Sequence, residues 1–223
     1  KGIRQETNSE VIVQETFSTG HIQECILHIV NSFNDVPLSN MFYYYIEALL
    51  HSKITAGCTS NEYCPNNTVL RSQMAKFICS SMEKANSNSC SIGTCNQIFA
   101  DVPSSNPFCS YIEALYNAGV VSGCQSSPLE YCPTNATNRQ AMAKFICLGM
   151  EQAIPGSCAA SICGGIFADV PSSNPFCQYI EALYNAGVVN GCNTSPLMYC
   201  PTNNVTRGQM SKFIINAFDF MLY

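Results

Sequence analysis

The chain has 223 residues, of which 47% are hydrophobic and only 11% are charged, and its formal net charge is −5. The hydrophobic content suits a globular protein, whereas the charged fraction is well below the roughly 25% of an average soluble domain. The ten lysines and arginines are scattered, which excludes the basic surface that nucleic-acid binding requires. No apolar run reaches the ~18 residues that a membrane span needs, and a surface so poor in charge favours association.

Two segments precede the main part of the chain. Residues 1–20 contain V-I-V amid polar residues, which is compatible with an extended arm or, equally, with a disordered tail. Residues 21–32 (H-I-Q-E-C-I-L-H-I-V-N-S) carry apolar side chains at helical spacing and predict an extra amphipathic helix.

An eleven-residue string then recurs. F-A-D-V-P-S-S-N-P-F-C occupies residues 99–109 and again 167–177, and a looser copy, F-N-D-V-P-L-S-N-M-F-Y, occupies 33–43. Such self-similarity predicts an array of one supersecondary unit. The three copies are placed at residues 33–98, 99–166 and 167–223.

Each copy predicts a helix-loop-helix unit, so the fold is expected to be mainly α. A D-V-P turn leads into an amphipathic helix that is expected to stop at a glycine, namely Gly57, Gly123 or Gly191. A cysteine-bounded loop ending in Tyr-Cys-Pro follows, and then a second helix, as at residues 140–150. Strand signals are confined to short pieces flanking the cysteine loop.

The fifteen cysteines indicate disulfides and therefore an oxidising, extracellular or cell-surface location. They form no Cys-x-x-Cys motif and have no recurring histidine beside them, so no metal site is expected. The short loops predict three bonds, Cys58–Cys64, Cys124–Cys132 and Cys192–Cys200. Two sets of four match at an offset of 68 and are each expected to form two bonds across a linker, with connectivity left open: Cys79, Cys90, Cys95 and Cys109; Cys147, Cys158, Cys163 and Cys177.

Cys25 remains without a partner in this scheme. It is either buried as a small apolar side chain or bonded to another subunit. Its neighbours Ile22, Ile26 and Ile29 favour the buried alternative.

The repeated pattern resembles the S-layer homology repeat. The third copy shows it best, with F-A-D-V-P from Phe167, Y-I-E-A-L from Tyr179, G-V-V-N-G-C from Gly187 and T-R-G-Q-M from Thr206. The cysteine-bearing version is similar to a variant in secreted bacterial proteins. The resemblance implies three repeats around a pseudo-threefold axis that bind a pyruvylated secondary cell-wall polymer. The tryptophan of the family is replaced here by Phe42, Phe108 and Phe176.

By that resemblance, the candidate polymer contacts are three arginines with three aspartates nearby: Arg71, Arg139 and Arg207; Asp35, Asp101 and Asp169. Each group also has a structural interpretation. The aspartates can cap the turn or helix that follows them. The arginines can pair with the repeated glutamates of a neighbouring copy, and the repeated lysines are expected on a solvated face: Glu47, Glu113 and Glu181; Lys76, Lys144 and Lys212.

Catalysis is not expected. The repeated carboxylates occur in three equivalent copies, whereas an active site pairs groups in unlike environments, and no nucleophile elbow, phosphate loop or histidine triad is present. No cofactor is expected either. Two functions remain: self-assembly into a surface layer or filament, with the chain itself as partner, or anchoring to an anionic cell-wall polysaccharide. The sequence favours assembly, because nearly the whole chain is repeat and no cargo domain is attached.

Overall fold

The computed structural model describes residues 9–16, 22–29 and 31–222, with side chains described from residue 31 onward. Six helices and three small antiparallel sheets make up these segments, so the fold is mainly helical. The helices are α1 (Tyr43–His51), α2 (Arg71–Ala85), α3 (Cys109–Asn117), α4 (Arg139–Ala153), α5 (Cys177–Asn185) and α6 (Arg207–Phe218). Divided at the expected boundaries, each repeat holds one short helix followed by one longer helix.

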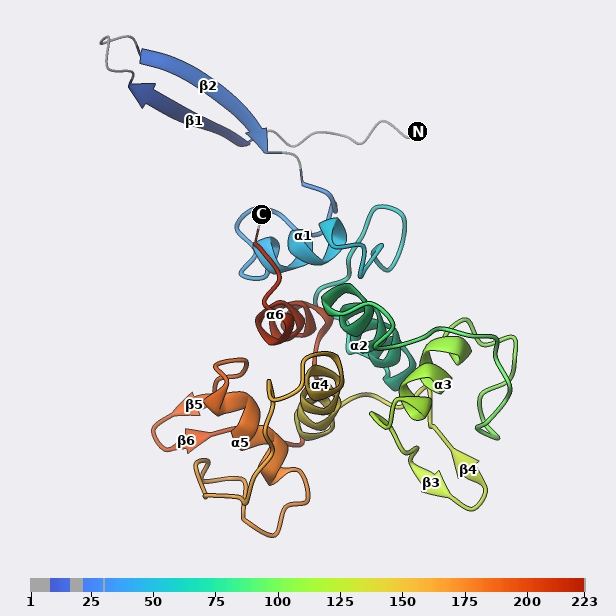
Figure 1. Ribbon diagram of the computed structural model, residues 1–223. Helices are drawn as coiled ribbons and strands as arrows, with labels where there is room; N and C mark the ends of the chain where they lie inside the picture. The colour runs from blue at the N-terminus through green and yellow to red at the C-terminus, as the bar shows by residue number, and fades with distance from the viewer. Residues whose placement is uncertain (1–8, 17–21, 30, 223) are drawn as a thin grey trace.

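The longer helices α2, α4 and α6 lie together at the centre, and the short helices and cysteine loops lie outside them (Figure 1). Each short helix packs on a long helix of another repeat: α3 on α2, α5 on α4, and α1 on α6. The first repeat therefore packs against the last. One core cluster runs through all three repeats, and a smaller cluster around Phe33, Ile46 and Tyr63 belongs to the first repeat.

The segments that precede the long helices are joined by a ring of backbone hydrogen bonds. The amide of Val69 donates to the carbonyl of Val205, Val205 donates to Thr137, and Thr137 donates to Val69, each at 2.9 Å. The first N–H of each long helix also donates to another repeat, as Arg71 does to the carbonyl of Asn135 at 2.9 Å. Helix starts leave such donors without partners inside the helix, so a neighbouring repeat is needed to satisfy them.

The extra helix expected at residues 21–32 is wrong. Ile22–Ile29 forms strand β2, which pairs antiparallel with strand β1, Ser9–Thr16. The spacing of the apolar residues fits a helix, but isoleucine and valine favour extended backbone, and V-I-V in β1 supplies a partner strand. The extended part of the arm expected at residues 1–20 corresponds to β1. Residues 1–8, 17–21 and 30 lie outside the described residues.

The first helix of each repeat also ends earlier than expected. Helices α1, α3 and α5 stop six residues before Gly57, Gly123 and Gly191, at His51, Asn117 and Asn185. In the second and third repeats, Gly119 and Gly187 follow the helix in the left-handed conformation, with φ of 74° and 72°. These are the residues that end the helices, because left-handed backbone at this position suits glycine.

The cysteine loops of the second and third repeats hold two-residue strand pairs. Strands β3 (Gln125–Ser126) and β4 (Leu129–Glu130) pair in one loop, and β5 (Asn193–Thr194) and β6 (Leu197–Met198) pair in the other. Among the helices described, none has the length and apolar character needed to cross a lipid bilayer.

Candidate functional site

The three candidate arginines are the first residues of the long helices, and each one reaches into another repeat. The guanidinium Nε of Arg71 donates to the carbonyl of Tyr131 at 2.9 Å, and the Tyr131 hydroxyl donates back to the Arg71 carbonyl at 2.9 Å. The same exchange joins Arg139 to Tyr199 and Arg207 to Tyr63. Arginine thus links the start of a central helix to the Tyr-Cys-Pro segment of another repeat.

Each guanidinium also lies between two aromatic rings. The Cζ atom of Arg207 is 4.5 Å from the ring centre of Tyr63 and 5.6 Å from that of Phe77. Arg71 and Arg139 have matching pairs of rings, Tyr131 with Phe145 and Tyr199 with Phe213. A cation over an aromatic face is stabilised by the ring quadrupole. Aromatic packing therefore compensates part of what the guanidinium loses by leaving water.

Burial changes the protonation equilibria of these groups. Loss of solvation lowers the pKa of all three guanidinium groups, and the neighbouring tyrosine and aspartate act in the opposite direction. Burial likewise raises the pKa of the three tyrosines well above the ordinary value of 10, against the attraction of the nearby arginine. The arginines stay charged and the tyrosines neutral at physiological pH, because arginine titrates far above it.

The repeated aspartates do not cap the turn or helix directly after them. The two carboxylate oxygens of Asp101 accept hydrogen bonds from the amides of Tyr131 and Cys132, both at 2.7 Å. Asp35 and Asp169 bind the equivalent amides of Tyr63–Cys64 and Tyr199–Cys200. Each of these cysteines has a positive φ, near 56–59°, so the aspartate holds a turn that is unfavourable for a residue with a side chain. The expected cap of the following turn is therefore wrong, because each aspartate binds backbone amides about thirty residues further along the chain.

The repeated glutamates do not pair with the arginines as expected. Glu113 accepts hydrogen bonds from the amides of Asn96 at 2.7 Å and Ile98 at 2.9 Å, and Glu181 binds Gly164 and Ile166 in the same way. Glu47 accepts from the amide of Ser32 at 3.1 Å. These buried carboxylates hold the segment that enters each repeat, because that segment presents backbone donors that no helix or sheet satisfies.

Seven disulfides hold the outer parts of the repeats. The three bonds across the short loops are Cys58–Cys64, Cys124–Cys132 and Cys192–Cys200, the same pairs that the sequence indicates. The two sets of four resolve into Cys79–Cys90 with Cys95–Cys109, and Cys147–Cys158 with Cys163–Cys177. Each linker is therefore tied to the helix before it and to the helix after it. The side chain of Cys25 lies outside the described residues.

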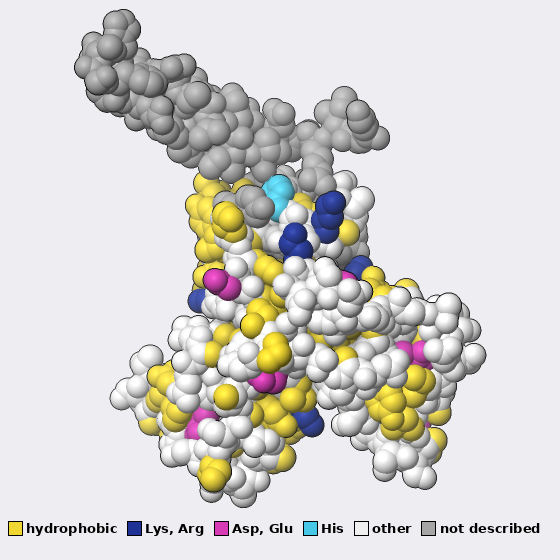
Figure 2. Space-filling view, viewed as in Figure 1, with side chains coloured by type: hydrophobic (Ala, Val, Ile, Leu, Met, Phe, Trp, Pro, Cys, Tyr) yellow, Lys and Arg dark blue, Asp and Glu magenta, His cyan; other side chains and the backbone are white. Residues whose placement is uncertain are grey.

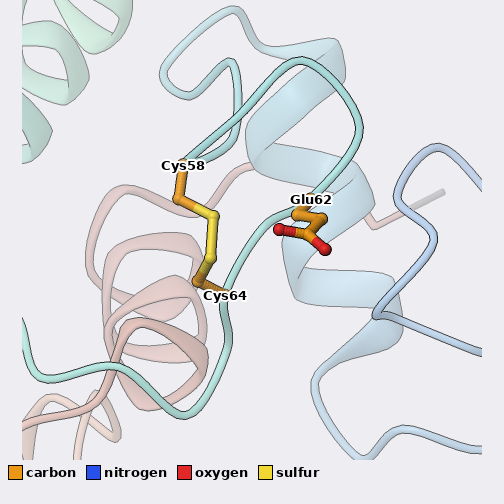
Figure 3. Close-up of side chains that lie close together, drawn as sticks. All are labelled: Cys58, Glu62 and Cys64. Carbon is orange, nitrogen blue, oxygen red and sulfur yellow. A yellow bond between two sulfur atoms is a disulfide. The ribbon is translucent and has the colours of Figure 1, made fainter.

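Several cysteines lie close to a carboxylate, as Cys58 and Cys64 do to Glu62 (Figure 3). All the cysteines in these groups are in disulfides, and a metal ion binds thiolate rather than disulfide sulfur. These clusters therefore offer no set of metal ligands, and Glu62 is an exposed side chain on a surface loop.

A groove opens beside two of the arginines. The first, the Arg207 groove, is a cavity of about 210 Å³ lined by residues 54–58 with Lys76, Phe77, Phe108 and Arg207. The second, the Arg71 groove, has a volume of about 110 Å³ and equivalent walls: residues 120–123 with Lys144, Phe145, Phe176 and Arg71. All three repeats contribute to each groove, so a single repeat cannot form it.

The third arginine has the same kind of neighbours, and this set of residues is called the Arg139 site. Arg139 Nη2 donates to the carbonyl of Asn190, its guanidinium lies over the ring of Phe213 on α6, and the ring of Phe42 lies against Gly208 at the start of that helix. The three phenylalanines that replace the family tryptophan therefore occupy equivalent positions.

The sequence did not indicate the aromatic residues around each guanidinium, nor the role of the lysines. Lys76, Lys144 and Lys212 are half-buried, with the Nζ atom 5.7–5.9 Å from the ring centre of a tyrosine on the adjacent short helix. They do not lie on an open, solvated face. Lys-Phe-Ile and Tyr-Cys-Pro recur in all three copies, and this recurrence could have drawn attention to these residues. It does not reveal which repeat supplies the aromatic rings that contact each arginine.

Comparison with known proteins agrees with the repeat pattern. The model of the S-layer homology domain matches residues 32–75 and 166–211, which contain Asp35 and Arg71, and Asp169 and Arg207. A curated relative, the amylopullulanase of Thermoanaerobacterium thermosulfurigenes, is 25% identical over 206 residues, which is 92% of this chain. The chain spans about 10% of the length of that relative. The protein therefore carries S-layer homology domains, matched in its first and third repeats.

Proposed function

We propose that this protein is a non-catalytic cell-surface module that binds an anionic cell-wall polysaccharide in the grooves between its repeats. In this proposal the three repeats surround a pseudo-threefold axis and present three related sites. The observation that carries it is an arginine in each repeat that is largely removed from water and has no carboxylate within 4 Å among residues 31–222. The S-layer homology match supports a location at the cell surface.

The arginines are cations largely removed from water. Arg139 and Arg207 are only 8% and 6% exposed. Within residues 31–222, the only ion pair closer than 4 Å joins His51 to Glu47, so none of the arginines has a carboxylate at that distance. The aspartate nearest to each arginine uses its oxygens to bind backbone amides. A buried cation without a directly bonded anion is costly, and an anionic ligand relieves that cost.

The surroundings of the arginines suit a sugar acid. Each of the two grooves adds a lysine to the arginine, and neither is lined by an aspartate or glutamate. The phenylalanine rings offer flat apolar surface on which the C–H face of a sugar ring can pack. A planar guanidinium binds a carboxylate through directed N–H bonds, which favours a carboxylate-bearing sugar over a neutral one.

Retention on purified wall polysaccharide that carries pyruvylated sugars tests this function. We expect the wild-type protein to bind, to be released by salt because the attraction is electrostatic, and to ignore the same polymer after its pyruvate groups are removed. The triple variant Lys76→Ala, Lys144→Ala, Lys212→Ala should lose retention. Lys84→Ala, which removes an exposed lysine from the last turn of α2, is the matched control. Equal binding to the polymer with and without pyruvate contradicts the proposal.

Self-assembly is a second candidate, and the hairpin β1–β2 favours it. The sheet that contains these strands has two members, so each strand has an outer edge that is not paired within the described residues. Unpaired strand edges are templates for pairing with another chain. The face of the molecule in Figure 2 also carries few charged side chains, and repulsion between copies is correspondingly weak.

Light scattering and electron microscopy of the full chain, compared with a variant lacking residues 1–30, test assembly. The proposal expects ordered oligomers for the full chain and monomers for the shortened one. If the full chain remains monomeric at high concentration, the assembly proposal is wrong, and the proposal of polysaccharide binding still stands.

A further inference from the structure

The three arginines are equivalent in sequence, but the structure makes one of them different. Resting on the proposed function, we propose that the Arg207 groove is the principal ligand site. It takes one carboxylate-bearing sugar residue per chain, and the Arg139 site contributes little to binding. Three independent features of the described residues separate these sites: the hydrogen bonds of the guanidinium, the residue after the short helix, and the wall of the groove.

The first feature is a guanidinium nitrogen without a partner. In the Arg139 site, Nη2 donates to the carbonyl of Asn190 at 3.1 Å. The Nη2 atom of Arg207 is buried and has no hydrogen-bond partner among the described residues, although this side chain is more than nine-tenths buried. Unsatisfied buried donors are rare in folded proteins and often mark a position that a ligand or ion completes. A small movement of the guanidinium toward a carboxylate in the groove would satisfy this N–H.

The second feature is a lysine in an unfavourable backbone conformation. Lys53 is exposed and has a φ of 61°, whereas its counterparts Gly119 and Gly187 have φ of 74° and 72°. A residue with a side chain is disfavoured in this region, and such strain is typically retained where it serves a function. Lys53 directly precedes the segment 54–58 that lines the Arg207 groove. The first repeat therefore has a lysine directly before its groove-lining segment, at the position where the other two repeats have glycine.

The third feature is the wall of the groove itself. Thr55 lines the Arg207 groove at the position that Val121 and Val189 occupy in the other repeats. Its hydroxyl oxygen accepts a hydrogen bond from the amide of Gly57 at 3.2 Å, a bond that does not use the hydroxyl hydrogen. That hydrogen can donate to a sugar oxygen. The Arg207 groove is also larger, about 210 Å³ against about 110 Å³ for the Arg71 groove.

These features define the chemistry of the ligand. A carboxylate placed between the guanidinium of Arg207 and the ammonium of Lys76 satisfies both cations, and Phe77 and Phe108 offer apolar surface to the rest of the sugar. The cavity is smaller than the roughly 300 Å³ at which pockets for drug-sized ligands begin. It therefore suits one sugar residue with its acidic group rather than an extended stretch of polymer.

Calorimetric titration of the full chain with a methyl glycoside bearing a pyruvate ketal tests the proposal, with methyl glucuronide and a neutral methyl glycoside as comparisons. We expect one dominant site per chain. Because one charge-assisted contact is lost, Lys76→Ala should weaken binding by about tenfold. Lys144→Ala and Lys212→Ala, the equivalent changes on α4 and α6, should weaken binding by less than about twofold.

A fourth variant separates ligand binding from folding. Lys53→Gly places in the first repeat the residue that the other repeats have, so the protein should be at least as thermally stable as the wild type. The same variant should bind the pyruvylated glycoside about three- to fivefold more weakly, because one exposed positive charge is lost. If Lys53 had only a structural role, Lys53→Gly would bind the glycoside with the affinity of the wild type.

Three titration outcomes overturn the proposal: three equal sites, equal losses in the three single lysine variants, or unchanged affinity in both Lys76→Ala and Lys53→Gly. Preference for the glucuronide rejects the pyruvate ketal as the acidic group. These failures remain distinct from failure of the proposed function, which shows as a wild-type protein that is not retained on the wall polymer. If the wild-type protein is retained on the polymer and the three lysine variants lose equal affinity, the protein is an anchor with equivalent grooves.

Discussion

Replacing Thr137 by valine should stabilise the protein. Thr137 is 1% exposed and occupies the ring of backbone hydrogen bonds in which Val69 and Val205 are its counterparts, both fully buried. Its amide and carbonyl are bonded within this ring, but its hydroxyl oxygen is buried without a hydrogen-bond partner among the described residues. Valine has nearly the same shape, and the two other repeats already have it at this position.

The magnitude follows from the environment of the hydroxyl. A buried polar group without a partner costs about 1–3 kcal/mol relative to solvation in water, and a buried methyl group in its place contributes about 0.8 kcal/mol. The backbone hydrogen bonds of residue 137 are unaffected by the change. Allowing for imperfect fit of the new methyl group, we expect Thr137→Val to raise the free energy of unfolding by about 1–2 kcal/mol. For a chain of this length, the unfolding temperature should rise by about 2–8 °C.

Equilibrium unfolding in guanidinium chloride, with the disulfides intact, measures this change. The midpoint should rise with no change in the slope, because the surface exposed on unfolding is the same. Thr134→Val, at an exposed position three residues earlier, is the control and should remain within about 0.5 kcal/mol of wild type. Val69→Thr should produce the opposite shift. An unchanged or lowered midpoint for Thr137→Val would show that the hydroxyl has a favourable interaction, and the reasoning would be wrong.

Two further outcomes are expected. Asp101→Asn removes a charge from two 2.7 Å hydrogen bonds to the amides of Tyr131 and Cys132, and should lower the free energy of unfolding by about 1.5–3 kcal/mol. Glu62→Gln, on an exposed loop, should leave the denaturation midpoint unchanged, and equal effects of the two variants would contradict the role of the aspartate. Stability should also fall as pH rises above 10, because the unfolded chain then ionises tyrosines whose pKa burial raises in the folded state. This stability is fully present below pH 10, and a denaturation midpoint that stays constant from pH 9 to 11 would contradict it.

The sequence predicted those features of the fold that depend on patterns among residues close together in the chain. Apolar residues at helical spacing predicted the two helices of each unit, as in α4, where Met142, Phe145 and Ile146 are buried. The repeat itself was visible because whole strings recur, and the short cysteine loops identified three disulfides by proximity along the chain. The prediction failed where one segment fitted both a helix and a strand. Residues 22–29 have helical spacing and strand-forming side chains, and pairing with β1 decided between them.

The site depended on contacts that no local pattern contains. The resemblance to the S-layer homology repeat identified Arg207 and Asp35 as candidates, but not the groups that each one binds. Tyr63 and Arg207 are 144 residues apart and become neighbours only because the first repeat packs against the last. The recurrence of the arginine in each copy also gave no sign that Nη2 of Arg139 has a hydrogen-bond partner whereas Nη2 of Arg207 has none among the described residues.

By itself, the sequence determined the repeated unit and the two helices in each copy, and its cysteines indicated an oxidising compartment, because apolar spacing and cysteine register act along the chain. The tertiary structure decided which repeat completes each groove and which arginine has a buried Nη2 atom without a hydrogen-bond partner among the described residues. Those properties arise from packing between segments far apart in sequence, where distances of a few tenths of an ångström decide whether a hydrogen bond forms.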